Sequence, residues 1–174
     1  MKYFVKFVVV TFFLLFCTNS FAEQKIVILD LKYILNNSKA GKGAQDFLKK
    51  KFDENAKKFS EMEKSLKKEE NALLSKKNAI SKDDYNKESD TLRKKVIDYQ
   101  SQRRSSLETI ATQRAESRET LIKKIDPILA SHIKENNIWL IVDKRSTLAG
   151  NPAVDITKDI IEKLNQELPS LNLK

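Results

Sequence analysis

The sequence is poor in the residues that build most catalytic and metal sites. Its 174 residues include one histidine, His132, and one cysteine, Cys17. There is no histidine pair for zinc, no glycine-rich phosphate loop and no serine in a nucleophile elbow. We therefore expect no enzyme activity and no cofactor, metal or nucleotide. We interpret His132 as a packing or surface residue, because a lone histidine rarely acts as a catalyst.

Glycine and proline are also scarce, with three of each, and none lies between residues 44 and 126. As one straight helix this segment would be about 125 Å long, whereas a compact chain of this size has a radius of gyration of about 15 Å. The segment must therefore fold back on itself. Ser81, followed by Asp83 and Asp84, is a helix-start signal near its centre. The sequence predicts a hairpin arm, residues 44–126, with its tip near 76–82.

Apolar residues recur at coiled-coil spacing in both limbs of this hairpin. In the first limb Leu48 and Met62 accompany a heptad series, which comprises Phe52, Phe59, Leu66 and Leu73. In the second limb an eleven-residue period includes three arginines, and its members are Leu92, Val96, Tyr99, Arg103, Leu107, Ile110, Arg114, Arg118, Leu121, Ile125 and Leu129. Both stripes are narrow. We expect most of these residues to pack within the hairpin and the others to remain available to a partner.

Residues 1–22 have the parts of an export signal. Two lysines precede an apolar run, residues 7–17, which is too short to span a bilayer as a helix. Small residues at Ser20 and Ala22 suit a signal peptidase. We therefore expect a cleaved signal peptide, with the mature chain beginning at Glu23.

Cys17 lies within this predicted signal, so the mature chain would have no disulfide and would be held together by packing alone. Lipidation at Cys17 is an alternative, although the bulky Phe16 before it fits that motif poorly. Loss of two lysines lowers the formal charge from +9 to +7. This charge favours acidic polypeptides or anionic lipids as partners, while export makes nucleic acid the least available.

Two apolar runs flank the predicted arm, at residues 26–29 and 137–143, and their composition is typical of strands buried on both faces. A turn signal at residues 150–152 follows the second run. Thr157 is placed to cap a final helix over residues 158–168, which Pro169 would stop.

The segments outside the arm, residues 23–43 and 127–174, are assigned to a β-rich base. A core built from so few residues without disulfides is marginal alone, and two apolar strands would leave exposed edges. We therefore expect an obligate oligomer. Its predicted interface comprises Ile26, Val27, Ile28, Leu29, Trp139, Leu140, Ile141 and Val142.

Four stretches carry a resemblance to a known family: "KIVILD", "SKAGKGAQ", "NNIWLIVDK" and "NPAVDIT". Together with the export signal and the charged helical hairpin, they make the mature chain resemble the Skp family of periplasmic chaperones, also called the OmpH family. The resemblance implies an α+β fold, in which a long α-helical coiled-coil hairpin arm projects from a small β-rich oligomerisation base. It also implies a jellyfish-like homotrimer whose arms enclose a cavity.

Members of that family hold unfolded outer membrane proteins in the cavity and use no nucleotide or metal. The resemblance implies the same ATP-independent holdase role here, with lipopolysaccharide or another anionic lipid as a further partner. Such binding needs weak contacts from apolar groups, flexible methionine and long lysines. The expected client-binding residues on the arm are Phe52, Phe59, Met62, Leu66, Leu73, Tyr85, Leu92, Tyr99, Lys67, Lys68, Lys76 and Lys77.

Two other functions compete with this interpretation. A structural or adaptor protein of the cell envelope would dock one defined partner through the hairpin tip, residues 74–84. A nucleic-acid binder would suit the net charge of +5 over residues 57–104, but it disagrees with the export signal and with the few aromatic residues available for stacking on bases. We expect no nucleic acid as a partner.

Overall fold

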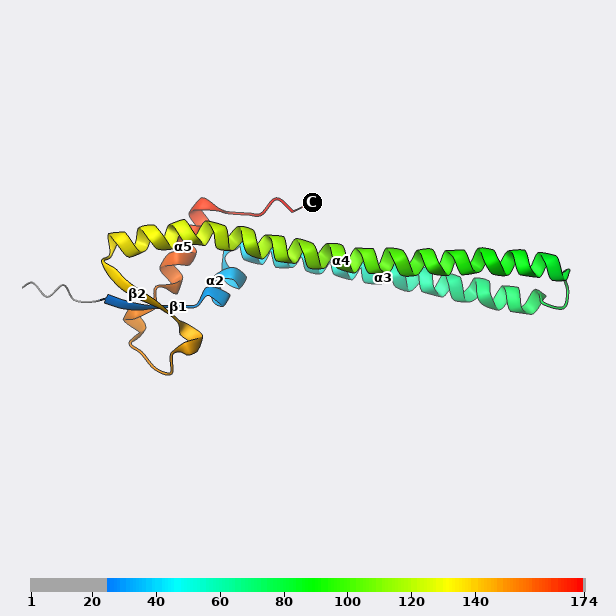
Figure 1. Ribbon diagram of the computed structural model, residues 1–174, viewed down its shortest axis with the longest axis horizontal. Helices are drawn as coiled ribbons and strands as arrows, with labels where there is room; N and C mark the ends of the chain where they lie inside the picture. Colours follow the sequence, from blue (N-terminus) through cyan, green and yellow to red (C-terminus); the bar gives the residue numbers. More distant parts are fainter. Residues whose placement is uncertain (1–24, 174) are drawn as a thin grey trace, which may run out of the picture.

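The computed structural model describes residues 25–173. The predictions for the export signal and for Cys17 lie outside these residues. Figure 1 shows a long helical hairpin projecting from a small base. The elements in chain order are β1 (Lys25–Leu29), α2 (Leu31–Asn37), α3 (Lys39–Lys76), α4 (Lys82–Glu135), β2 (Ile138–Asp143), two short 3-10 turns (Lys144–Ser146 and Pro152–Val154) and α5 (Thr157–Glu167). The predicted α+β class, with a helical arm and a small strand-containing base, is confirmed.

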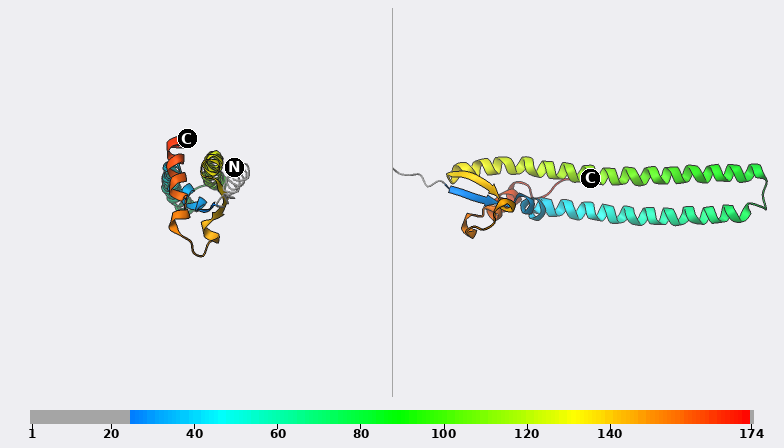
Figure 2. Two further views of the ribbon diagram at one scale, coloured as in Figure 1. Left: turned by 90° about the vertical axis from the view of Figure 1, so that its left-hand side faces the viewer. Right: turned by 60° about the horizontal axis from the view of Figure 1, so that its bottom comes forward.

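The two long helices lie side by side from the base to the tip (Figure 2, right). Helix α3 has 38 residues and α4 has 54, so α4 alone is about 80 Å long. Both continue past the limits expected for the arm. Ser38 caps α3, because its Oγ accepts a hydrogen bond from the backbone N–H of Gly41 at 3.2 Å. Pro127 lies inside α4 and is exposed, so the carbonyl that loses its partner faces water.

The turn at the tip forms as its sequence predicts. Helix α3 ends at Lys76, and α4 begins after Ser81. The Oγ of Ser81 accepts a hydrogen bond from the backbone N–H of Asp84 at 3.1 Å and donates to the Asp84 carboxylate at 2.7 Å. Asp83 and Asp84 occupy the first turn of α4, where carboxylates interact favourably with the positive end of the helix dipole.

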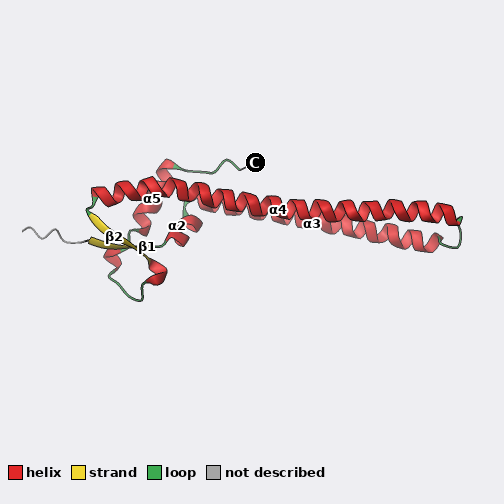
Figure 3. Ribbon diagram, in the orientation of Figure 1, coloured by secondary structure: helices red, strands yellow, loops and turns green. Residues whose placement is uncertain are grey.

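Strands β1 and β2 form a two-stranded parallel sheet, with Val27 opposite Ile141 and Leu29 opposite Asp143. Parallel strands need a long crossover, and here the crossover is the entire arm. Figure 3 shows that helices make up most of the base. The base was expected to be rich in β-strands, but within residues 25–173 it contains two strands, β1 and β2.

The core of the base lies between β1, α2, α5 and the last turns of α4. Its fully buried members include Val27, Ile34, Ile160 and Leu164, and Ile125 of α4 packs among them. The strands were expected to be buried on both faces. Within the single chain Val27 and Leu29 of β1 point into the core, whereas Ile26 remains exposed.

The predicted cap of the last helix is wrong. Thr157 is the first residue of α5, and its hydroxyl instead accepts a hydrogen bond from the backbone N–H of Asp30 at 2.9 Å. The Asp155 carboxylate accepts from the Thr157 N–H at 3.0 Å and pairs with Lys144 at 2.7 Å. Although partial burial opposes the change, these bonds lower the pKa of Asp155. Thr157 therefore joins α5 to the end of β1.

Helix α5 also holds both long helices at the base. The side-chain oxygen of Asn165 accepts a hydrogen bond from the backbone N–H of Lys39, the first residue of α3, at 2.6 Å. Lys163 pairs with Glu135, the last residue of α4, at 2.9 Å. The hydrogen bond from Lys163 lowers the pKa of the Glu135 carboxyl. One short helix thus connects the start and the end of the arm.

Candidate functional site

Packed side chains and an ion pair join the two helices along the hairpin seam. Phe59 and Tyr99 meet edge to face, with ring centroids 6.0 Å apart and planes at 72°, a favourable aromatic arrangement. The Tyr99 hydroxyl lies 3.4 Å from Glu63. Nearer the tip, Lys95 of α4 pairs with Glu69 of α3 at 2.7 Å. These contacts hold the two helices together with few buried residues.

The seam of α4 departs from the predicted stripe in the inner half of the arm. Ser106, Gln113 and Ser117 face the seam, and Asn55 of α3 donates a hydrogen bond to Ser106 at 2.6 Å. The stripe residues Arg103, Leu107, Arg114 and Arg118 are exposed. A guanidinium is rarely buried without a partner, so the helix places smaller, neutral side chains at the interface.

This change opens a first hollow, which we call the distal hollow. Phe52 and Leu107 were predicted at the seam, yet each is 48% exposed. Between them lies a hollow of about 420 Å³. Its lining residues are Phe52, Asn55, Ala56, Phe59, Ser60, Glu63, Tyr99, Arg103, Ser106 and Leu107. Aromatic and aliphatic groups form much of its wall, and one cation, Arg103, and one acid, Glu63, also line it.

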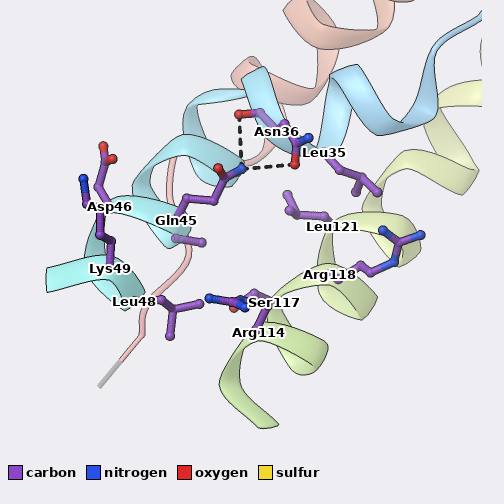
Figure 4. Close-up of a pocket in the computed structure, with 12 residues that line it drawn as sticks. Leu35, Asn36, Gln45, Asp46, Leu48, Lys49, Arg114, Ser117, Arg118 and Leu121 are labelled. Atoms are coloured by element: carbon purple, nitrogen blue, oxygen red, sulfur yellow. Dashed lines mark hydrogen bonds between the residues drawn. The ribbon is translucent and has the colours of Figure 1, made fainter. Parts of the chain in front are cut away.

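A second hollow, the root hollow, lies where α2, α3 and α4 meet (Figure 4). Its volume is about 520 Å³. Three buried leucines line it, Leu35, Leu48 and Leu121. The remaining lining residues are Asn36, Gly41, Ala44, Gln45, Asp46, Lys49, Arg114, Ser117 and Arg118. The root hollow therefore also combines apolar groups with exposed cations.

Both hollows lie along one face of the arm. Around the axis of α4, Arg103, Leu107, Arg114 and Arg118 fall within about 60° of one another. Another hollow between the long helices has a different character, because its lining is mainly polar and its α4 residues, such as Ser101, Gln102 and Ser105, lie outside that arc. We call the side that carries the distal and root hollows the apolar-cationic face.

The structure places the twelve expected client-binding residues in different environments. Phe59, Leu73 and Tyr99 are no more than 8% exposed and pack within the hairpin. Phe52 is well exposed, and Lys76 pairs with Glu88 at 3.6 Å. Four others are half-buried: Met62, Leu66, Tyr85 and Leu92. The remaining lysines are exposed: Lys67, Lys68 and Lys77.

The distal hollow brings only Phe52, Phe59 and Tyr99 of that set together. It adds Leu107 and Arg103, which the expected set omitted. The signal was present in the sequence, because Leu107 belongs to the stripe and Arg103 interrupts it. The departure of the seam from the stripe could not be read from spacing alone.

The predicted interface residues also differ in their exposure to solvent. Trp139 is 67% exposed and Leu140 is 47% exposed on β2, and Ile26 of β1 lies opposite Leu140. Ile28, Ile141 and Val142 are half-buried, whereas Val27 and Leu29 belong to the core of the chain itself. Ile26 and Leu140 are therefore exposed together on one side of the sheet, and Trp139, the neighbour of Leu140 along β2, adds a separate exposed ring.

Two further properties concern residues 25–173 only. No helix in this range is both long enough and apolar enough to cross a membrane. No cluster of histidine, cysteine and acidic side chains within the range is arranged to hold a metal ion.

Comparison with known proteins identifies the family to which this chain is similar in sequence and fold. Residues 25–164 match the family described as Outer membrane protein (OmpH-like). A Skp-like protein of Pseudomonas aeruginosa PAO1 is 27% identical over 166 residues, which cover 95% of this chain and 99% of that protein. A crystal structure of an OmpH-like protein from Caulobacter crescentus CB15, a candidate outer membrane chaperone, superposes with a TM-score of 0.80 at 18% identity. That match covers 88% of this chain and 90% of the other. The chain therefore belongs to the OmpH-like family, which confirms the resemblance to Skp and OmpH proteins.

Proposed function

We propose that this chain is a periplasmic, ATP-independent holdase chaperone that binds unfolded outer membrane proteins and prevents their aggregation. The observation that carries the proposal is the apolar-cationic face of the arm, where two open hollows lie between helices that share a narrow seam. Family membership and the likeness to a candidate outer membrane chaperone support it.

The chemistry of the face suits an unfolded membrane-barrel protein. The strands of such a client alternate apolar and polar residues, and exposed apolar strands aggregate through their edges. The distal hollow can take an apolar side chain against Phe52 and Leu107, while Arg103 lies beside it for an acidic or carbonyl oxygen. Contacts of this kind are individually weak, so one face can hold many different sequences.

Assembly would follow from the exposed apolar side of the sheet. Ile26 and Leu140 expose apolar side chains on that side, Trp139 is also exposed on β2, and exposed apolar groups of this kind are typical of protein interfaces. We propose that three chains join through this surface and hold their arms around a cavity. Because the protein would use no nucleotide, client release would come from folding or from transfer to a better partner.

The structure leads us to revise the proposed client-binding residues. Phe59, Leu73 and Tyr99 mainly stabilise the hairpin, because each is no more than 8% exposed, although Phe59 and Tyr99 also line the distal hollow. Phe52, Leu107 and the exposed lysines of the outer arm are reachable without any such change. Lipopolysaccharide or another anionic lipid remains a predicted additional partner, favoured by the net charge of +5 over residues 57–104.

Replacing both Phe52 and Leu107 with serine is expected to weaken the binding of an unfolded barrel protein about tenfold. About half of each side chain is exposed and can be covered by a client, and complete burial of such a side chain contributes about 1.5–3 kcal/mol. Fluorescence anisotropy with a labelled, urea-unfolded client measures the affinity.

The matched control is Ile97→Ser. Ile97 is 59% exposed on α4 but lines neither hollow. This variant should bind as the wild type does. If client binding weakened equally in both variants, any exposed apolar residue of the arm would bind the client. The proposal that the apolar-cationic face is the binding site would then be rejected.

One observation favours the adaptor alternative. Leu74 is 55% exposed at the tip, beside the exposed Lys77, and could anchor a docked protein. An adaptor would capture one folded partner in a fixed ratio, and Leu74→Ser would abolish that capture. A holdase instead keeps unrelated unfolded barrel proteins soluble. An aggregation assay with two such clients distinguishes the two functions.

A further inference from the structure

The three arginines that interrupt the apolar stripe of α4 all border a hollow. Arg103 lines the distal hollow, and Arg114 and Arg118 line the root hollow. Residues four apart on a helix lie on the same face, and Arg114 and Arg118 border one hollow from two directions: Figure 4 shows Arg114 next to Leu48 and Arg118 on the side of Leu121. Lys49 of α3 borders the same site (Figure 4).

The charge of the root hollow is largely uncompensated. Asp46 is the single acidic residue in its lining, against Lys49, Arg114 and Arg118. Within residues 25–173 neither arginine takes part in an ion pair. Because each guanidinium can bind a carboxylate through two parallel hydrogen bonds, the site is suited to a carboxylate ligand.

The interior of the root hollow is apolar. Leu48 and Leu121 are 3% exposed and Leu35 is also buried. Ala44 on α3 has only a small side chain at this hollow, whereas Gly41 packs closely against the Leu35 carbonyl. The volume of about 520 Å³ lies in the range of small-ligand sites. The ligand must therefore place an apolar group very close to its negative charge.

An internal acidic residue of an extended client meets this condition poorly. Neighbouring side chains of a strand point to opposite faces, so an acidic side chain and an adjacent apolar one cannot enter the same hollow. The last residue of a polypeptide carries its carboxylate and its side chain on one α-carbon. The amides of Asn36 and Gln45, which hydrogen-bond to each other at 3.2 Å at the border, can donate to and accept from a peptide group.

We infer that the root hollow binds the free C-terminal carboxylate of an unfolded polypeptide, together with the apolar side chain of its final residue. A guanidinium at the border of the hollow holds the carboxylate, and the apolar lining contacts the side chain. This inference rests on the proposed holdase function and names the part of the client that the arm root recognises.

The test uses two fluorescent ten-residue peptides that both end in phenylalanine and differ only in a terminal carboxylate or carboxamide. With the mature protein, anisotropy should show about tenfold tighter binding of the free acid, as expected for a lost charge-assisted pair. In Arg114→Gln/Arg118→Gln this preference should disappear. Both side chains are exposed, so the variant should keep its fold, which circular dichroism checks.

The control is Lys94→Gln/Arg104→Gln, which removes the same charge from exposed arm residues outside both hollows. It should retain the preference for the free acid. Persistence of that preference in the root-hollow variant would overturn the inference. The inference would also fail if the wild-type protein bound the two peptides equally while the root-hollow variant lost binding to anionic lipid vesicles.

The same experiment separates the inference from the function beneath it. If the wild-type protein keeps an unfolded barrel protein soluble but binds acid and amide peptides equally, the inference fails and the holdase proposal stands. If the protein binds neither peptide and leaves the barrel protein to aggregate, the holdase proposal itself fails.

Discussion

Replacing Gly41 with alanine is expected to destabilise the protein by about 1–3 kcal/mol, the usual cost of overpacking a well-packed site. A Cβ atom on Gly41 would overlap the backbone carbonyl oxygen of Leu35 and would lie 2.9 Å from the Oγ of Ser38. The first contact involves backbone, which cannot move aside without shifting α2 from α3. The second involves the hydroxyl that caps α3.

Gly43 supplies the matched control, because a Cβ atom there would meet nothing within 4 Å. Gly43→Ala should stabilise the protein by up to about 1 kcal/mol through higher helix propensity. Urea denaturation followed by circular dichroism, at one fixed protein concentration, measures both variants. Changes of the same sign in the two proteins would contradict a close approach specific to Gly41.

The second large effect is expected at the exposed side of the sheet. Leu140→Asp should convert the proposed trimer to monomers, because a carboxylate buried in an apolar interface without a partner is costly. Leu140 is a better target than Ile28 or Ile141, which pack partly within their own chain. The substitution should therefore separate the chains while sparing the fold of each one.

Light scattering coupled to size exclusion measures the mass of this variant. Leu74→Asp is the control, since it places the same charge at an equally exposed leucine of the arm tip, and it should leave the mass unchanged. A Leu140→Asp protein that retains the wild-type mass would show that this side of the sheet is not the interface.

The elements of this fold were predictable wherever the signal is local. Ser81 with its two following aspartates marks the turn, because capping involves residues only a few positions apart. The runs of branched apolar residues mark both strands in the same way. The hairpin followed from length, since no glycine or proline interrupts residues 44–126.

The features that sequence missed depend on contacts between distant segments. The Thr157 hydroxyl serves Asp30, which lies 127 residues earlier in the chain, and no local pattern reveals that partner. Pro127 was taken as the start of the base, yet it lies on the solvent side of α4, where its missing hydrogen bond is tolerated.

The hollows were missed for a related reason. Spacing placed Arg103, Arg114 and Arg118 in the seam, but the helix turns Ser106 and Ser117 toward α3 instead. The cost of burying a guanidinium decides between these registers, and that cost depends on the facing helix. The arginines were therefore visible as interruptions, while their position beside apolar hollows was not.

The most direct test of the account is whether the mature protein alone, without nucleotide, holds an unfolded outer membrane protein in solution. Diluting the denaturant from such a client should give a soluble complex whose mass equals one client plus three chains, with light scattering from aggregates suppressed. A client that aggregates as fast with the protein as without it would contradict the account.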